Sequence, residues 1–221
     1  MSKISVLMSV YKKENPEYLR ASLESILVQT RTADEILLIE DGPLTQELYQ
    51  VVAEYQKKCD YLHVHAMEQN VQLGRALAKG VELCQYDLIA RMDTDDIAMP
   101  DRLEKEEAYM EAHPEVDVVG GAIREFNDEG TIDRVKNMPK TQEEILEYVK
   151  VRNPLNHMTV MYRKDSILKA GNYKHFPFLE DYSLWSRMLS QGYQFRNMED
   201  ILVRARTSMG LVKRRSGWAY Y

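Results

Sequence analysis

The 221-residue sequence predicts an α/β fold with a doubly wound, mostly parallel sheet and a smaller, irregular C-terminal region. In the first half, short apolar runs alternate with amphipathic stretches in the order β-α-β-α-β-α-β. This alternation is typical of parallel strands joined by right-handed crossovers. Polar residues follow the apolar runs, and in such sheets ligands bind beyond the carboxyl ends of the strands. The pattern therefore predicts the fold class and the edge of the sheet that carries function.

The first half begins with an apolar run from Ile4 to Val10, which is typical of a buried strand. Asn15 and Pro16 then supply an N-cap and a proline at the first helical position. They begin a helix whose apolar stripe ends near Leu27. The same alternation continues to residue 92. The other elements expected here are strands 36–39, 61–66 and 87–92 and helices 45–58 and 74–84.

The second half has a less regular pattern. Thr141 and Glu144 form a capping box for a helix that reaches about residue 150. Another helix opens at Glu180 and stops at Gly192. No linker or internal repeat divides the chain, so we expect one domain over residues 1–221. The other elements expected are a helix over 100–112, strands 116–120, 123–126, 159–163, 193–196 and 201–204, and a short helix ending at Gly171.

Composition places the chain among ordinary soluble globular proteins, with 44% hydrophobic and 29% charged residues. The net charge of −6 provides no basic field, which argues against nucleic acid as a partner. The two cysteines, Cys59 and Cys84, have no metal-ligand spacing and favour a reduced, cytoplasmic location. A strand expected from Ile4 leaves no room for a signal peptide, and no apolar run approaches the roughly 20 residues that span a bilayer.

The C-terminus is basic and aromatic, which allows two interpretations of equal weight. It is either a solvated tail or a peripheral contact with the anionic inner face of the cell membrane. The chain stops after Tyr221 without a turn or cap, as a truncated chain would. The residues concerned are Arg204, Arg206, Lys213, Arg214, Arg215, Trp218, Tyr220 and Tyr221.

The most informative segment is Arg91-Met92-Asp93-Thr94-Asp95-Asp96, which follows an apolar strand. Carboxylates this close repel one another unless a cation lies between them, and hard oxygen ligands favour Mg²⁺, Mn²⁺ or Ca²⁺. Asp93 and Asp95 would lie on the same side of an extended chain, so both would reach one ion. The alternatives are an Asx-type turn with a helix cap, or an EF-hand loop. The EF-hand is disfavoured because Ala98 stands where it needs glycine.

Other polar residues follow the neighbouring strands of the first half. Tyr11 and Asp41 come after the first two strands, and we expect them to lie in the ligand crevice. Asn70 and Arg75 flank the start of a helix, where amide groups and the helix dipole favour an anion. The alternatives are a turn-capping aspartate and a solvent-exposed arginine. No phosphate-binding glycine pattern is present, which argues against a P-loop NTPase and an NAD-dependent oxidoreductase.

Two candidates for acid–base or ligand chemistry lie in the second half. Glu180 and Asp181 open a helix after an aromatic loop, and they either compensate the helix dipole or supply a general base. A carboxylate beside a second one in a partly apolar cleft would have a raised pKa. His157 precedes a strand and is either structural or a ligand of substrate or metal in the same cleft.

Taken together, these segments resemble the family 2 glycosyltransferases of the GT-A fold over nearly the whole chain. Among them the chain is most similar to bacterial enzymes that build capsular, exopolysaccharide or O-antigen chains. It departs from the family pattern at Pro43 and at Met8-Ser9, where no catalytic group is involved. The segments that carry the resemblance are 5–11, Glu40-Asp41-Gly42, Asn70 with Gly74 and Ala78, 91–96 and 180–185.

The resemblance implies a nucleotide-binding half over residues 1–112 and an acceptor-side half over 113–221. Tyr11 and Asp41 would hold the base, with Asp41 accepting the imide N–H of uracil. Asn70 and Arg75 would complete the donor site near base and ribose. Asp93 would approach the ribose or the metal. Asp95 would coordinate the Mn²⁺ or Mg²⁺ that bridges the diphosphate.

The resemblance also implies a mechanism and its partners. Asp181 would deprotonate the acceptor hydroxyl as it attacks the anomeric carbon of a UDP-sugar, and a single displacement of this kind inverts configuration. Glu180 and His157 would contact substrate or metal nearby. The acceptor would be a growing polysaccharide or a lipid-linked oligosaccharide. Two alternatives are a sugar nucleotidyltransferase, whose glycine-rich N-terminal loop is missing here, and a non-catalytic nucleotide-sugar-binding partner of a synthase complex.

Overall fold

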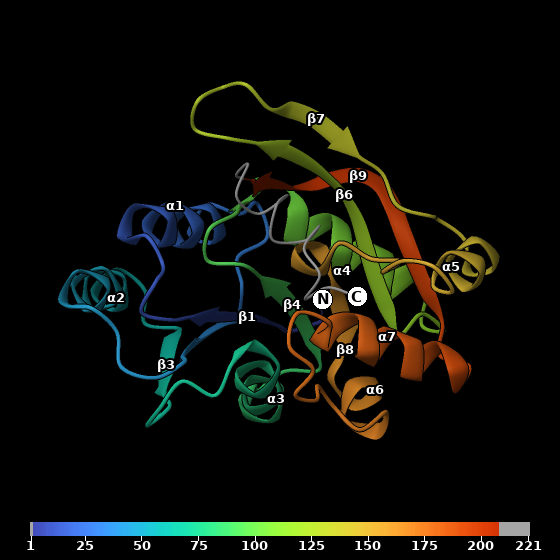
Figure 1. The fold of residues 1–221 in the computed structure, drawn as a ribbon, viewed down its shortest axis with the longest axis horizontal. Coiled ribbons are helices and arrows are strands. Elements are labelled where there is room, and N and C mark those ends of the chain that lie inside the picture. Colours follow the sequence, from blue (N-terminus) through green and yellow to red (C-terminus); the bar gives the residue numbers. More distant parts are fainter. Residues whose placement is uncertain (1, 208–221) are drawn as a thin grey trace.

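The computed structural model describes residues 2–207, which form a nine-stranded sheet flanked by helices (Figure 1). The strand order is β3-β2-β1-β4-β8-β6-β9-β5, and β7 pairs with β6 outside this path. The strands of the first half are β1 (Ile4–Val10), β2 (Glu35–Glu40), β3 (Leu62–Ala66), β4 (Leu88–Met92) and β5 (Ile97–Ala98). Those of the second half are β6 (Val118–Phe126), β7 (Asp133–Lys136), β8 (Met161–Arg163) and β9 (Phe195–Arg206).

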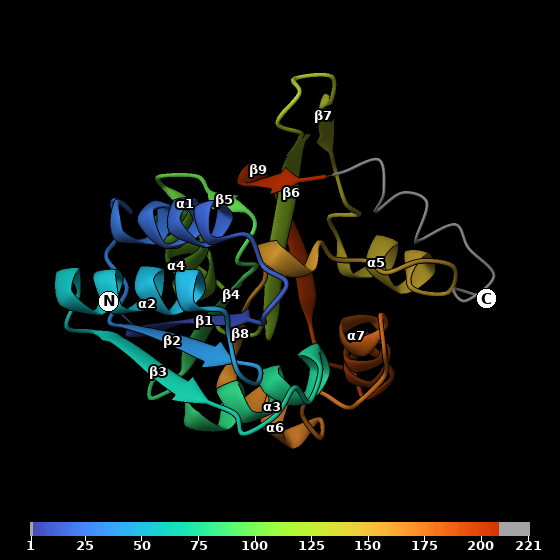
Figure 2. The same cartoon turned by 60° about the vertical axis from the view of Figure 1, so that its left-hand side comes forward.

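Helices cover both faces of the sheet and divide the core in two. Side chains of α1, α2 and α4 pack with one face, while those of α3, α5, α6 and α7 pack with the other. Figure 2 shows α1 and α2 on one side of β1 and β2, and α3 and α6 on the other. The helices are α1 (Pro16–Leu27), α2 (Gln46–Lys58), α3 (Leu73–Leu83), α4 (Arg102–Ala112), α5 (Gln142–Tyr148), α6 (Lys164–Lys169) and α7 (Glu180–Ser190), with a 3₁₀ turn at His157–Thr159.

The first half follows the sequence pattern closely. Asn15 caps α1 by accepting the amide of Glu17, and Pro16 is its first residue. Strands β1, β2, β3 and β4 pair in parallel, so their carboxyl ends meet at one edge. The predicted α/β class with its doubly wound sheet is confirmed.

The strands differ from the expected elements in three ways. The strands expected at 116–120 and 123–126 form one strand, β6, and those expected at 193–196 and 201–204 form one strand, β9. The pairing of β6 with β9 is parallel but shifts register near Gly120 and Ala122, which explains why each appears interrupted in sequence. The capping box of Thr141 and Glu144 is confirmed, whereas β5 and β7 are strands that the pattern did not predict.

Within residues 2–207, no helix combines the length and the apolar character needed to cross a membrane. Cys59 and Cys84 are both free and buried. Of the basic and aromatic C-terminal cluster, Arg204 and Arg206 belong to β9, and the other members lie outside the described residues.

Candidate functional site

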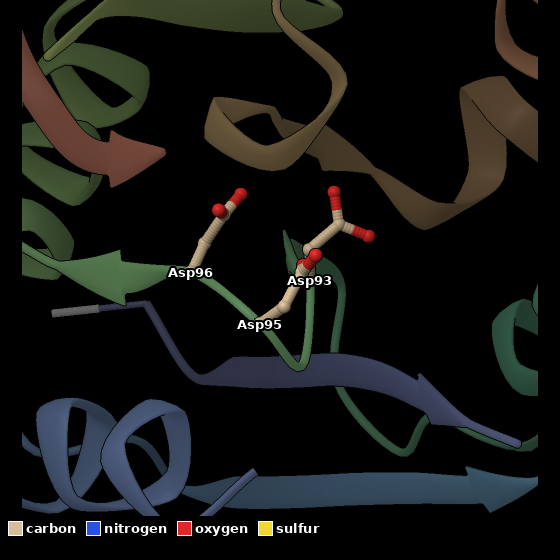
Figure 3. A group of neighbouring side chains, drawn as sticks. All are labelled: Asp93, Asp95 and Asp96. Carbon is tan, nitrogen blue, oxygen red and sulfur yellow. The ribbon is translucent and has the colours of Figure 1, made fainter. Parts of the chain in front are cut away.

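The acidic segment after β4 forms a tight turn that gathers three carboxylates. Figure 3 shows the side chains of Asp93, Asp95 and Asp96 on the same side of this turn. One oxygen of each lies within 4.8 Å of the others. Thr94 points elsewhere, because its hydroxyl donates to Glu14 at 2.6 Å. The expected pairing of Asp93 and Asp95 therefore arises from a turn rather than an extended strand, and Asp96 joins them.

The carboxylates of this turn destabilise one another's charge. Burial and the neighbouring charges of Asp93 and Glu14 raise the pKa of Asp95 to about 7. Burial and the same cluster raise the pKa of Asp96 well above its usual value. A divalent cation would relieve this repulsion, and oxygen-only donors suit Mg²⁺ or Mn²⁺. The residues present thus fit the metal that was expected from the sequence.

Arg206, at the end of β9, holds the acidic turn in place through two hydrogen bonds. Its amide donates to Asp96 at 2.7 Å, and its Nε donates to the carbonyl oxygen of Asp95 at 3.1 Å. The guanidinium lies over the ring of Tyr18, 3.8 Å from its centroid. A pocket of about 350 Å³ opens beside it and is lined by Tyr11 and Asp95, among others. Tyr11, 43% exposed, thus shares a pocket with the acidic turn.

Asp41 and Asn70 form a second cluster at the ends of β2 and β3. The side-chain amide of Asn70 donates to Asp41 Oδ2 at 2.8 Å, and the Val71 amide donates to Oδ1 at 2.6 Å. Gly42 has a φ of +82°, and a Cβ there would lie 2.5 Å from the Asn70 nitrogen. Burial raises the pKa of Asp41, while amide donors lower it. The expected proximity of Asp41 and Asn70 is therefore present.

The start of α3 packs directly against the loop that precedes α7. A Cβ at Gly74 would lie 2.6 Å from the Lys174 carbonyl oxygen and 3.1 Å from Glu180 Cβ. Arg75 is exposed on the first turn of α3, next to this contact. Glu180 is half-buried, and burial raises its pKa. Gly74 therefore connects a strand-end loop of the first half with the acidic residues of the second.

Asp181 lies in a polar niche at the first turn of α7. Its Oδ2 accepts the side-chain amide of Asn153 at 2.5 Å, and its Oδ1 accepts the Tyr182 amide at 2.7 Å. His157 Nδ1 is 3.9 Å from Oδ2, while its Nε2 lies 2.9 Å from the Tyr173 hydroxyl. Burial raises the pKa of Asp181, and burial lowers the pKa of His157 well below its usual value. The site thus holds a buried carboxylate beside a neutral imidazole.

Arg91 belongs to the site although the sequence pattern did not single it out as a site residue. Its guanidinium, 2% exposed, donates through Nη2 to Asp93. Its charge also acts on Asp181 and His157, so it lies near the niche of Asp181 as well as the acidic turn. Asn153 and Arg206 were likewise not assigned site roles. Their partners come from distant parts of the chain, so no local spacing could have identified them.

Comparison with known proteins adds the following. Residues 5–175 match the family model described as Glycosyl transferase family 2. The chain is 43% identical to the amylovoran biosynthesis glycosyltransferase AmsE of Erwinia amylovora, covering 98% of this chain and 80% of that protein. It is 35% identical to an Escherichia coli UDP-Gal:alpha-D-GlcNAc-diphosphoundecaprenol beta-1,3-galactosyltransferase, covering 99% of this chain and 79% of that protein.

Solved structures share the fold at low sequence identity. Staphylococcus aureus TarS 1–349 in complex with UDP-GlcNAc aligns with a TM-score of 0.76 at 20% identity, over 94% of this chain. The mannosyltransferase PcManGT of Pyrobaculum calidifontis, in complex with GDP-Man and Mn²⁺, aligns with a TM-score of 0.73 at 12% identity. The chain spans 59% of the first and 58% of the second of these structures. These likenesses show the GT-A fold.

Proposed function

Because the chain belongs to glycosyl transferase family 2 and is a glycosyltransferase, we propose that it transfers a sugar from a UDP-sugar to an acceptor hydroxyl. The acceptor is a growing polysaccharide or a lipid-linked oligosaccharide, and the transfer inverts the configuration at the anomeric carbon. The observation that carries this proposal is the presence of a three-carboxylate turn and a separate buried carboxylate, Asp181, both of which interact with the charge of Arg91. The first suits a metal-bound diphosphate, and the second suits an acceptor hydroxyl.

The donor would be held by residues of the first half, residues 1–112. Tyr11 borders the pocket beside the acidic turn, and Asp41 and Asn70 form a pre-arranged polar pair at the neighbouring strand ends. In this proposal Tyr11 and Asp41 contact the base, and Arg75 lies near base and ribose. The names of two relatives support UDP: the Escherichia coli enzyme uses UDP-Gal, and TarS binds UDP-GlcNAc.

A divalent cation, Mn²⁺ or Mg²⁺, would be held by Asp93 and Asp95, with Asp96 beside them. When bound, it supplies positive charge that offsets the charge developing on the nucleoside diphosphate as it leaves. The support is the mutual destabilisation of these carboxylates, which raises the pKa of Asp95 to about 7. The Mn²⁺ in the mannosyltransferase of the same fold agrees with this donor set.

Asp181 would act as the general base on the acceptor side, residues 113–221. Its carboxylate would take the proton of the acceptor hydroxyl as that oxygen attacks the anomeric carbon and the bond to the diphosphate breaks. The hydrogen bonds from Asn153 and the Tyr182 amide hold the carboxylate in one orientation. His157 would support this niche from the side while remaining neutral. Because one displacement suffices, no covalent intermediate on the protein is needed.

The acceptor class is inferred from relatives and from charge. The Erwinia amylovora relative is named for amylovoran biosynthesis, and the Escherichia coli relative acts on a diphosphoundecaprenol-linked sugar. A lipid-linked acceptor suits an enzyme at the inner membrane face, to which the basic and aromatic C-terminus would bind peripherally. The same proposal assigns donor binding to residues 1–112 and acceptor binding to residues 113–221.

The proposal is tested by measuring UDP release and glycan product across a panel of UDP-sugars, with Mn²⁺ and lipid-linked acceptors. The native chain should transfer one of these sugars, whereas Asp181→Asn should lose about 10²–10⁴-fold in turnover, the usual contribution of general base catalysis. Donor binding by Asp181→Asn, measured by calorimetry with UDP, should stay near native. Tight UDP binding by the native chain without any transfer would contradict the proposal and favour a non-catalytic partner.

A further inference from the structure

Arg91 is a buried cation whose hydrogen-bonding capacity is only partly used. Its side chain is 2% exposed and donates to Asp93 through Nη2. Its Nε and Nη1 are buried, and within residues 2–207 no hydrogen-bond acceptor is found for either. Burying a guanidinium is unfavourable unless carboxylates balance its charge. Two donor groups of Arg91, besides the one that binds Asp93, are therefore open to a further negative partner.

The strand position of Arg91 directs it toward α7. Arg91 follows Ile89 by two residues in β4, so both side chains lie on the same face of the sheet. Ile89 packs there in one cluster with Tyr173 and Trp185. The charges of Asp93 and Asp181 both act on the guanidinium, which in turn lowers the pKa of Glu180 beside Asp181. One arginine thus faces both the acidic turn and the carboxylate at the start of α7.

The other groups around Asp181 do not carry a compensating positive charge. Asn153 and the Tyr182 amide are neutral donors. His157 is held in its neutral form by burial and by Arg91 itself, which lower its pKa. The Tyr173 hydroxyl is buried and its pKa is raised to a value at which it stays protonated. Glu180 adds a further negative charge beside Asp181. Without Arg91, the neighbouring carboxylates of Glu180 and Asp181 would have no cation beside them among residues 2–207.

Building on the proposed function, we propose that Arg91 is a positioning residue that links the donor side of the site to the general base. Its bond to Asp93 fixes the guanidinium, and its charge keeps Asp181 ionised and oriented for the acceptor hydroxyl. Arg91 touches neither substrate, since its nitrogens are enclosed. It acts through the two carboxylates, so its loss affects turnover more than donor binding.

The test compares Arg91→Met, Arg91→Lys and the matched control Arg163→Lys. Arg163 is also largely enclosed, but its guanidinium donates only to the backbone carbonyls of Met110, His113 and Val116. Turnover and the donor KM are measured from low to high pH for each protein. Carbon-13 NMR of labelled aspartate carboxyls, assigned with Asp181→Asn, follows the ionisation of Asp181 without any turnover.

For Arg91→Met we expect turnover at neutral pH to fall at least about tenfold, while the donor KM changes less than about threefold. The NMR-detected pKa of Asp181 should rise by roughly one unit, so the loss of turnover should shrink at high pH. Arg91→Lys should recover part of both effects because it keeps the charge. Arg163→Lys should leave both unchanged, even if its melting temperature falls.

Two results would overturn the role of Arg91. One is an unchanged Asp181 pKa in Arg91→Met, and the other is a loss of turnover that is the same at every pH and in Arg91→Lys. A native chain that transfers no sugar would instead contradict the proposed function. In that case the NMR titration would still decide whether Arg91 sets the ionisation of Asp181, so the two failures remain distinguishable.

Discussion

At the scale of single residues, Asp181 shows opposing influences on one carboxylate. Burial raises its pKa, while the amide of Tyr182, the side chain of Asn153 and the charge of Arg91 lower it. In the proposed mechanism Asp181 is the general base, which works only in its ionised form, so each of these influences would extend the pH range of activity toward acid. Asn153 is the easiest of these to remove without changing the others, because its side-chain amide reaches Asp181 from a different part of the chain.

Replacing Asn153 by alanine should therefore shift the pH dependence of turnover. Removing a donor to the charged form raises the pKa of Asp181, by up to about one unit for a single hydrogen bond. The rising acid limb of the pH–turnover profile should move to higher pH, and activity at high pH should stay near native. Asn197→Ala is the control, because Asn197 donates to the carbonyls of Pro139 and Pro154. An acid limb that stays in place would argue against Asp181 as the base.

Some site residues could be predicted from sequence and others could not, for a physical reason. Asp41 and Asn70 follow parallel strands, whose carboxyl ends must meet, so their proximity follows from the strand pattern. Asp93 and Asp95 are close in sequence and needed only a turn. Asn153 and Arg206 reach the site through the packing of distant elements, and no local spacing encodes that packing.

At the scale of elements, α4 contains a buried ion pair, and the arginine of this pair also bonds to β4. Arg102 and Glu106 are fully enclosed, with Arg102 Nε 3.1 Å from Glu106 Oε1. Arg102 Nη2 also donates to the Arg91 carbonyl oxygen at 2.8 Å. The helix therefore braces the strand that carries the acidic turn. Arg102 and Glu106 are tolerated in the interior because they form an ion pair with each other.

Breaking this pair on one side should be costly. Burial raises the pKa of Glu106 to about 7, and Arg102 opposes this rise. Arg102→Met leaves the enclosed Glu106 without its partner, so it must either carry an unpaired charge or take up a proton, and we expect about 3–5 kcal/mol loss in the free energy of unfolding. The double variant Arg102→Met with Glu106→Leu should recover most of that loss, because an apolar pair needs no charge compensation. Urea unfolding followed by circular dichroism measures both. If the double variant were as unstable as the single one, the bond to the Arg91 carbonyl would be the dominant contribution.

Element prediction succeeded where periodicity is local and failed where pairing is distant. The capping box at Thr141 and the proline start at Pro16 are short signals, and both elements form as expected. The two-residue strand β5 exists only because it pairs with β9, more than 100 residues later. The exposed β7 is likewise defined by β6 alone. The break expected between residues 120 and 123 is absent, and β6 continues through it.

At the scale of the whole molecule, the carboxylates of the acidic turn repel one another, and a bound cation would reduce this repulsion. A ligand that binds only the folded state stabilises it, by about 2.7 kcal/mol at one hundred times its Kd. Mn²⁺ at that level should raise the melting temperature of this chain by roughly 5–11 °C. Asp95→Asn should lose this shift, and without metal it should be at least as stable as the native chain because one repelling charge is gone.

The matched control for the metal experiment is Asp200→Asn. Asp200 pairs with Lys105 on the surface, away from the acidic turn, so the Mn²⁺-induced shift should persist in this variant. Differential scanning calorimetry with and without EDTA provides the measurement. An equal shift in Asp95→Asn and the native chain would mean that Mn²⁺ binds elsewhere.

The order of the strands could be predicted only in part. Four parallel strands follow from the alternating pattern, whereas β8 enters next to β4 in antiparallel fashion and brings β6 and β9 with it. Strand partners in a mixed sheet are chosen by packing over the whole molecule, which sequence periodicity does not record.

The contact at Gly74 has a consequence for building hybrid enzymes. The start of α3 meets the Lys174 carbonyl so closely that no side chain fits between them. A chimera that takes its first half from one relative and its second half from another would inherit this contact from two different parents. The halves would be held apart unless the first parent has glycine at position 74 and the second parent places its backbone as this chain does at Lys174. Recombination of the two halves is therefore limited by the lack of space for one methyl group at Gly74.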